Sequence, residues 1–232
     1  AEVFRICGDM RYMKNDFASA ITNYDLAVKA GTTDAIVFNN RGKAKMSSGD
    51  LNGALADFDK AIQLNGSNSK ALLNRGTVRF ALKDFAGATA DLEKAKASEG
   101  ESPETVKMLG IAYYLQGKKD LAGSYLDKAL NAGVKDSKVS LYAGYLKYDA
   151  GDFKGAQTAL NTAEQGGEKE DELYAKRGKA NYQQKEYLAA VADLEKTVQK
   201  GNADLSTYED ISLSYLATKK EKEAVASLEK AA

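Results

Sequence analysis

A glycine recurs every 34 residues along this 232-residue chain. It occurs at Gly8, Gly42, Gly76, Gly110, Gly144 and Gly178, and Ser212 takes the seventh place. Twelve positions after each of these residues the chain has Ala20, Ala54, Ala88, Ala122, Ala156, Ala190 and Ala224. A fixed period of this length predicts stacked copies of one small unit. The copies are residues 1–34, 35–68, 69–102, 103–136, 137–170, 171–204 and 205–232.

Each repeat is predicted to form two helices joined by a short turn. A glycine inside a helix costs about 1 kcal/mol relative to alanine, so its recurrence indicates two helices that approach closely. Bulky residues fill the complementary positions, at Phe4, Phe38, Leu72, Val106, Tyr174 and Tyr208 before the glycine and at Tyr24, Phe58, Leu92, Leu126, Leu160, Leu194 and Leu228 after it. Proline occurs only once, as Pro103, so the chain is predicted to be all-α.

Turn and capping residues support these helix boundaries. Turns between the two helices of a repeat are expected at Asn15-Asp16, Gly49-Asp50, Lys83-Asp84, Gly117-Lys118 and Gly151-Asp152. Helix ends between repeats are expected at Gly31, Gly133, Gly167 and Gly201. The following helices are expected to be capped by Asp34, Asn68, Ser102, Asp136 and Asp204.

These positions resemble the tetratricopeptide repeat (TPR), whose pattern has an aromatic residue, Leu-Gly, Ala, an aromatic residue or Leu, and Ala at the same offsets. The resemblance covers essentially the whole chain. It implies one right-handed solenoid of about 14 antiparallel helices that binds protein partners as a scaffold or adaptor. Two departures stand out. The family tyrosine three residues after the glycine occurs only at Tyr113 and Tyr215, and glycine turns replace the proline that usually closes a repeat.

An arginine and an aspartate vary together from repeat to repeat. Arg41, Arg75 and Arg177 directly precede the glycine, and only these repeats have an aspartate sixteen residues later, at Asp57, Asp91 and Asp193. The other repeats lack both residues. We therefore predict a partly buried, charge-assisted pair between the two helices of each repeat. Duplication of one ancestral repeat could produce the same pattern without contact.

Composition argues against catalysis and against several classes of partner. Lys plus Arg and Asp plus Glu both number 33, so no net field would attract nucleic acid or an anionic membrane. Histidine is absent, and nothing in the sequence places an activating base beside Cys7 or a serine. We predict a buried structural Cys7, no metal, no cofactor and no enzymatic activity. No segment is long and apolar enough to span a membrane, and no signal segment is visible, so the compartment stays open.

The TPR resemblance implies an inner groove lined by the first helix of each repeat. Its residues fall at the second, fifth, ninth and twelfth places, a spacing of three and four that keeps them on one helix face. The twelfth-place residues form a bulky ladder of Tyr12, Met46, Phe80, Tyr114, Tyr148, Tyr182 and Leu216. Two interpretations of this ladder stay open. It either packs between neighbouring first helices, or it forms a recognition strip for a partner.

The middle of this groove is the predicted binding site. The fifth- and ninth-place residues of repeats three to five are largely apolar, and an apolar strip facing solvent is typical of a surface that binds a peptide or helix. The candidate residues are Leu73, Thr77, Phe80, Lys107, Ile111, Tyr114, Leu141, Tyr145, Tyr148 and Tyr182.

Some TPR proteins hold a chaperone's terminal carboxylate in a clamp of Lys, Asn, Asn, Lys and Arg. The corresponding residues here are Arg5, Asp9, Asn40, Lys70 and Asn74. Asp9 would repel a carboxylate, and Asn74 lacks the cation, so this clamp is not expected.

The last repeat leaves Val225 and Leu228 without a following repeat to cover them. Either the chain is part of a longer protein or it self-associates through this end. Three functions therefore compete. The first is an interaction scaffold that binds a peptide or helix in the groove, and the second is a structural, self-assembling segment or an arm of a larger protein. The third, a stand-alone enzyme, is opposed by the missing catalytic groups.

Overall fold

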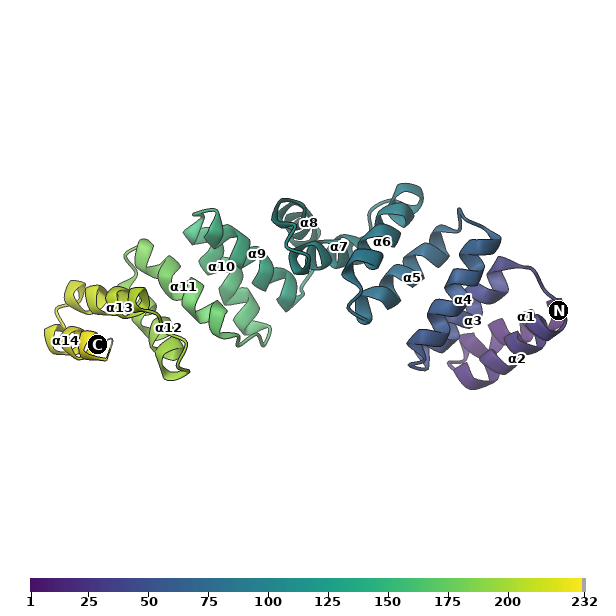
Figure 1. Cartoon of the computed structure of the whole chain (residues 1–232), viewed down its shortest axis with the longest axis horizontal. Coiled ribbons are helices and arrows are strands. Elements are labelled where there is room, and N and C mark those ends of the chain that lie inside the picture. The colour runs from purple at the N-terminus through teal and green to yellow at the C-terminus, as the bar shows by residue number, and fades with distance from the viewer. Residues whose placement is uncertain (231–232) are drawn as a thin grey trace. The chain divides into compact units, whose positions relative to one another are not determined.

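A computed structural model describes residues 1–230, apart from the side chain of Glu99. This range contains fourteen α-helices and no strand (Figure 1). The helices form two compact units, Ala1–Lys118 and Lys119–Ala232, with the boundary inside the fourth repeat. The prediction of one continuous array through all seven repeats stays a prediction. None of the helices within residues 1–230 has the length and hydropathy of a bilayer-spanning segment.

Each repeat contributes two consecutive helices, as predicted. The first unit contains α1 (Glu2–Met13), α2 (Phe17–Lys29), α3 (Ala35–Ser47), α4 (Leu51–Leu64), α5 (Ser69–Ala81), α6 (Phe85–Glu99) and α7 (Pro103–Leu115). The second contains α8 (Lys119–Asn131), α9 (Ser137–Asp149), α10 (Phe153–Gln165), α11 (Asp171–Gln183), α12 (Tyr187–Gln199), α13 (Leu205–Ala217) and α14 (Glu221–Glu229). Consecutive odd-numbered helices also contact each other within a unit, as α3 does with α5 and α9 with α11. We call the surface that the odd-numbered helices form in each unit the A face.

The recurring glycine allows close contact between the two helices of a repeat. A Cβ atom on Gly42 would lie 2.7 Å from Cε1 of Phe58, and one on Gly178 would lie 2.7 Å from Cδ2 of Leu194. Phe58 and Leu194 are fully buried. Alanines that follow the glycine, such as Ala54, are buried as well. The predicted reason for the 34-residue period is therefore confirmed.

Capping follows the predicted pattern. Backbone N–H groups of the next helix donate to the side chains of Asp34, Asn68, Ser102, Asp136 and Asp204. The five predicted turns, and the corresponding turns of the sixth and seventh repeats, each contain one residue in the left-handed region, at the fifteenth place of the repeat. These residues are Asn15, Gly49, Lys83, Gly117, Gly151, Lys185 and Lys219, with φ between 58° and 88°.

Replacing Lys185 by glycine is expected to stabilise the second unit by about 0.5–1 kcal/mol. Lys185 has φ 64°, a conformation that costs a residue with a Cβ about 1–2 kcal/mol, and part of this gain is lost to the greater chain entropy of glycine. Urea denaturation followed by circular dichroism measures the change. Lys185→Ala removes the same side chain and keeps the Cβ, so an equal gain in that variant would contradict the backbone explanation.

The predicted pairing of arginine and aspartate is confirmed in all three repeats. The Arg75 guanidinium donates from Nε and Nη2 to the two carboxylate oxygens of Asp91, at 2.7 and 2.6 Å. The pairs of Arg41 with Asp57 and of Arg177 with Asp193 have the same two-point geometry. Burial opposes the charge on Arg177, but the acidic groups around it outweigh burial and raise its pKa. Each pair therefore ties the two helices of one repeat together.

The same arginines also reach the preceding repeat. Nη1 of Arg41 donates to Asp25 at 2.8 Å, and Nη1 of Arg75 donates to Asp59 at 2.7 Å. Both acceptors lie sixteen residues before the arginine, on the second helix of the repeat before. Each arginine thus joins two successive even-numbered helices.

The prediction of a buried Cys7 is wrong, because its thiol is free and exposed. In later repeats the second helix of the preceding repeat covers the side of the first helix on which the residue corresponding to Cys7 lies. No described helix precedes α1, and Val3, Ile6 and Met10 on the same helix are exposed as well.

Candidate functional site

Six of the ten predicted groove residues lie on the A face of the first unit. Leu73, Thr77 and Phe80 belong to α5, and all three are half-buried. The Thr77 hydroxyl donates to the backbone carbonyl of Leu73 at 2.9 Å, so it points back to its own helix. On the neighbouring α7 lie Lys107, Ile111 and Tyr114. Lys107 pairs with Glu104 at 2.8 Å, and the side chain of Ile111 is buried.

The other four residues lie on the A face of the second unit. Leu141, Tyr145 and Tyr148 belong to α9, and Tyr182 belongs to the adjacent α11. Tyr148 and Tyr182 are half-buried, whereas Leu141 and Tyr145 are buried, with 0% and 2% of their surface exposed. Lys176 of α11 and Glu170, directly before that helix, both contact Tyr145. The Lys176 ammonium lies 5.7 Å from its ring centroid, and its hydroxyl donates to Glu170 at 3.4 Å.

The expectation of an apolar strip that faces solvent is therefore wrong for three of the ten residues. Ile111, Leu141 and Tyr145 are core residues. The other seven are half-buried. Whether these seven bind a partner stays a prediction.

The twelfth-place ladder packs within its own repeat. The Phe80 ring meets Phe85 at 5.7 Å between centroids, Tyr148 meets Phe153 at 5.8 Å, and Tyr182 meets Tyr187 at 6.0 Å. The second ring of each pair comes from the start of the following even-numbered helix. In these three repeats the ring partner therefore lies on the second helix of the same repeat, and Lys176 of the neighbouring first helix α11 also contacts Tyr148. Because the ladder rings are only half-buried, each also has a side that remains accessible.

Charged groups surround the ladder in the second unit. The Lys176 ammonium lies 4.8 Å from the Tyr148 ring centroid and donates to Asp149 at 2.6 Å. Lys119 donates to the same carboxylate at 2.6 Å. Burial raises the pKa of Asp149, but these two hydrogen bonds outweigh it and keep the pKa below its usual value. Burial raises the pKa of the Tyr148 phenol, and Asp210 adds to this effect.

Sequence reasoning considered the sixth place of the repeats only for the chaperone clamp and left it out of the predicted binding site. This place holds Lys176 and Asp210 in the second unit, and burial raises the pKa of the half-buried Asp210 carboxyl. In the first unit it holds Asn40 and Asn74. The sixth place lies four residues after the second and three before the ninth, so helical spacing alone puts it on the same face.

A polar hollow of about 310 Å³ lies on the A face of the first unit, between α1, α2 and α3. Asp9 is its centre and accepts hydrogen bonds from Arg5 at 2.7 Å, the Tyr24 hydroxyl at 2.7 Å and the Asn40 amide at 2.9 Å. Burial of Tyr24 and its hydrogen bond to Asp9 raise the pKa of its hydroxyl. The protein's own carboxylate therefore occupies two donors that a chaperone clamp would use.

The hydrogen bonds of this hollow continue along the A face. The Asn39 amide donates to Asn40, and the Asn74 amide donates to Asn39 at 3.0 Å, which links α1, α3 and α5. No group of three or more His, Cys, Asp or Glu side chains within the described range is placed to hold a metal ion.

Comparison with known proteins identifies the repeat. A family model for the tetratricopeptide repeat matches residues 39–104 and 142–204, more than half of the chain. No curated protein sequence matches significantly. A tetratricopeptide repeat protein from Parabacteroides merdae superposes with a TM-score of 0.59 and 21% identity, over 99% of this chain and 91% of that one.

Two further solved structures share the fold over most of both chains. YrrB, described as a TPR protein with an unusual peptide-binding site, has a TM-score of 0.58 and 19% identity over 89% of this chain and 97% of its own. Pseudomonas aeruginosa PilF has a TM-score of 0.61 and 16% identity over 90% and 95%. With its fourteen described helices and the matched family model, the chain belongs to the tetratricopeptide repeat family.

Proposed function

We propose that the chain is a non-catalytic scaffold whose A face binds a peptide or helix from a partner protein. The observation that carries this proposal is the row of half-buried rings on that face. Phe80 and Tyr114 lie in the first unit, and Tyr148 and Tyr182 lie in the second. A ring held on one side by a partner ring loses little entropy when a ligand covers its other side.

The polar groups beside these rings suit recognition of a peptide. In the second unit Lys176 lies over Tyr148, and Lys179 donates to Ser206 at 2.7 Å. In the first unit the amides of Asn40 and Asn74 lie along the same face as Phe80. Apolar anchors with a few placed donors and acceptors are typical of surfaces that bind peptides.

YrrB supports the proposal at the level of the fold, since its description assigns it a peptide-binding site. The shared fold makes the A face of this chain a reasonable place for the same kind of ligand. Which ligand binds would depend on the side chains that this chain itself has on its A face.

Replacing Tyr148 by alanine is expected to weaken partner binding about thirtyfold, since an aromatic anchor contributes about 2 kcal/mol. Crosslinking mass spectrometry in cell extract first identifies partners that contact α9 and α11. Titration calorimetry with the purified partner then measures the dissociation constant.

Phe153→Ala is the matched control, because it breaks the same ring pair from α10 and leaves the Tyr148 ring in place. We expect this control to bind within about threefold of the unmodified chain, which is less than 1 kcal/mol. Equal losses of partner affinity in the two variants would indicate that the effect comes from a less stable fold. If Tyr148→Ala left every partner bound, the A-face proposal would fail. Attention would then move to Val225 and Leu228, which are 57% and 47% exposed.

A further inference from the structure

In the second and sixth repeats the seventh residue is an arginine, and its neighbours correspond in the two repeats. In the second repeat the Arg41 guanidinium spans Asp25 on α2 and Asp57 on α4, and it lies 5.6 Å from the ring centroid of Phe38. The sixth repeat has the same parts, because Arg177 binds Asp193 and lies 5.7 Å from the Tyr174 ring. The setting therefore consists of an arginine, a ring, an aspartate on the helix after it and an acceptor on the helix before it.

The fifth repeat has lost three of these four parts. Ala143 stands in place of the arginine, Ala159 in place of the following aspartate and Ser140 in place of the ring. The acceptor on the preceding helix remains as Asp127, sixteen residues before Ala143, as Asp25 is before Arg41. Asp127 thus remains as an acceptor, although the arginine that it would bind is absent.

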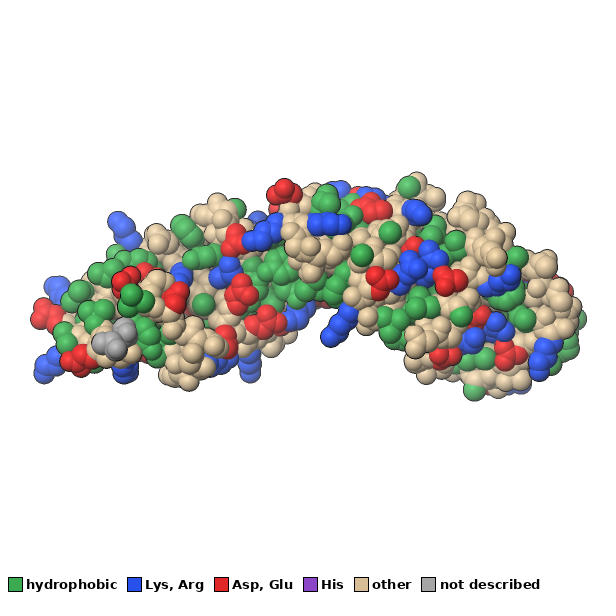
Figure 2. All heavy atoms as spheres, in the orientation of Figure 1, with side chains coloured by type: hydrophobic (Ala, Val, Ile, Leu, Met, Phe, Trp, Pro, Cys, Tyr) green, Lys and Arg blue, Asp and Glu red, His purple; other side chains and the backbone are tan. Residues whose placement is uncertain are grey.

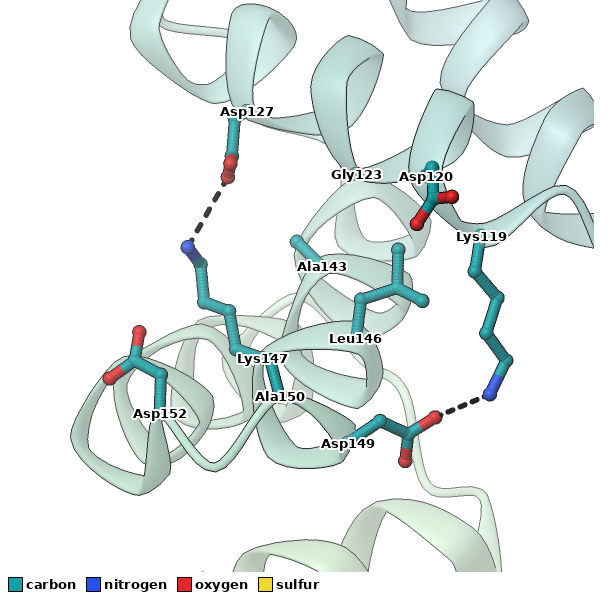
Figure 3. A pocket seen from close by; sticks show the side chains of 10 residues that line it. All are labelled: Lys119, Asp120, Gly123, Asp127, Ala143, Leu146, Lys147, Asp149, Ala150 and Asp152. Atoms are coloured by element: carbon teal, nitrogen blue, oxygen red, sulfur yellow. Dashed lines mark hydrogen bonds and ion pairs between the residues drawn. The ribbon is translucent and has the colours of Figure 1, made fainter.

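The space of the missing side chains is open. A hollow of about 460 Å³ lies between α8 and α9, and Gly123, Ala143, Leu146 and Ala150 line it with small or apolar groups (Figure 3). Gly123 widens it, because a Cβ at this position would have no neighbour closer than 3.8 Å. The corresponding Ile21 and Leu55 of the first two repeats are larger, and they pack against the core.

A second hollow of about 460 Å³ adjoins the first on the other side of Lys147. Ser140 and Ala159 line it, together with Thr158 and Thr162 of α10. Lys147 and Asp152 line both hollows. The first hollow therefore corresponds to the missing arginine, and the second to the missing ring and aspartate.

The first hollow carries an excess of negative charge. Asp120, Asp127, Asp149 and Asp152 line it, against Lys119 and Lys147 (Figure 3). The Asp127 side chain is 54% exposed, and its one ion pair among the described residues is with Lys147, at 3.3 Å. Exposed pairs of this kind contribute about 0–1 kcal/mol, so an incoming cation could replace Lys147 at little cost.

We propose that the hollow between α8 and α9 is a socket for an arginine side chain of a partner protein. The aliphatic stem would lie along Ala143 and Leu146, and the guanidinium would donate to Asp127. An apolar side chain next to that arginine would enter the second hollow, at the place that corresponds to Phe38 and Tyr174. Arginine fits better than lysine, because its planar fork can donate to both oxygens of one carboxylate at once. This site shares Lys119 and Asp149 with the charged surroundings of Tyr148, but it uses none of the ladder rings.

The test uses N-acetylarginine amide as the probe and the full ¹⁵N-labelled chain. We expect saturable shifts of the backbone amides of Gly123, Asp127 and Ala143 in heteronuclear NMR spectra. N-acetylcitrulline amide has nearly the same shape without the charge, and at equal ionic strength it should leave these signals in place. Asp127→Asn should weaken the arginine probe at least about fivefold, the range expected when one charged acceptor is lost.

Ala143→Arg combined with Ala159→Asp fills the socket from within and restores the arginine and the aspartate that the second repeat has at these places. This variant should keep its helical circular dichroism and lose the probe-induced shifts. Absence of saturable shifts in the unmodified chain would overturn the proposal. So would equal shifts in the filled variant or in Asp127→Asn, because both results would indicate nonspecific attraction to surface charge. Tyr148→Ala should leave the probe bound, so the socket and the A face can fail independently.

Discussion

Replacing Asp193 by alanine is expected to lower the free energy of unfolding of the second unit by about 3–5 kcal/mol. Asp193 and Arg177 are both 5% exposed. The substitution removes two hydrogen bonds of 2.7 and 2.8 Å and leaves a buried guanidinium without its main counter-charge. Asn161 and Glu164 still accept from Arg177, so we expect a value in the lower half of this range.

The chain supplies its own apolar control for this experiment. The fourth repeat has Leu109 and Tyr125 at the corresponding places. Arg177→Leu combined with Asp193→Tyr should therefore cost about 1–2 kcal/mol, less than Asp193→Ala alone, because no charge is left unpaired. Urea denaturation of the three proteins gives both differences. A cost below about 1 kcal/mol for Asp193→Ala would contradict a strong pair.

The features predicted correctly from sequence depend on offsets inside one repeat. The approach of Gly42 to Phe58 and the pair of Arg75 with Asp91 are both separated by sixteen residues. Two helices joined by a short turn have little freedom in how they pair. A regular period therefore determines which side chains meet within a repeat, and the internal comparison of seven copies identifies the pairs.

The features that sequence reasoning missed depend on how one repeat lies against the next. Burial of Tyr145 depends on the approach of α11 to α9, which no residue pattern within the fifth repeat encodes. The contact of Arg41 with Asp25 also crosses between repeats. Once this second offset of sixteen is known, Asp127 can be found in the sequence as an acceptor that lacks its arginine, because Ala143 follows it at the same distance.

Cys7 was misjudged for a related reason. It lies in the first repeat, where no described helix precedes α1. A comparison of repeats assumes that every copy has the same neighbours, so it predicted burial for a thiol that is exposed. Sequence reasoning considered Asp9 only as a group that would repel a bound carboxylate. In the structure Asp9 accepts three hydrogen bonds and organises a polar hollow.

Gly42→Ala is expected to destabilise the unmodified chain but to stabilise a chain in which Phe58 is also replaced. In the unmodified chain the new Cβ would lie 2.7 Å from Cε1 of Phe58, and this overpacking costs about 1–3 kcal/mol. Phe58→Ala alone removes a fully buried ring and should cost about 3–5 kcal/mol. With the ring gone, the methyl group of Gly42→Ala fills part of the cavity, and alanine is the better helix former. We then expect a gain of about 1 kcal/mol.

A double-mutant cycle in urea measures this reversal as a coupling between the two positions. Gly123→Ala provides the matched control, because this helical glycine has no neighbour within 3.8 Å of the added Cβ. That substitution should stabilise the chain by about 0.5–1 kcal/mol through helix propensity alone. If Gly42→Ala were as stabilising as Gly123→Ala, the α3–α4 contact would be looser than the structure has it. The recurrence of a glycine every 34 residues would then require a reason other than close packing.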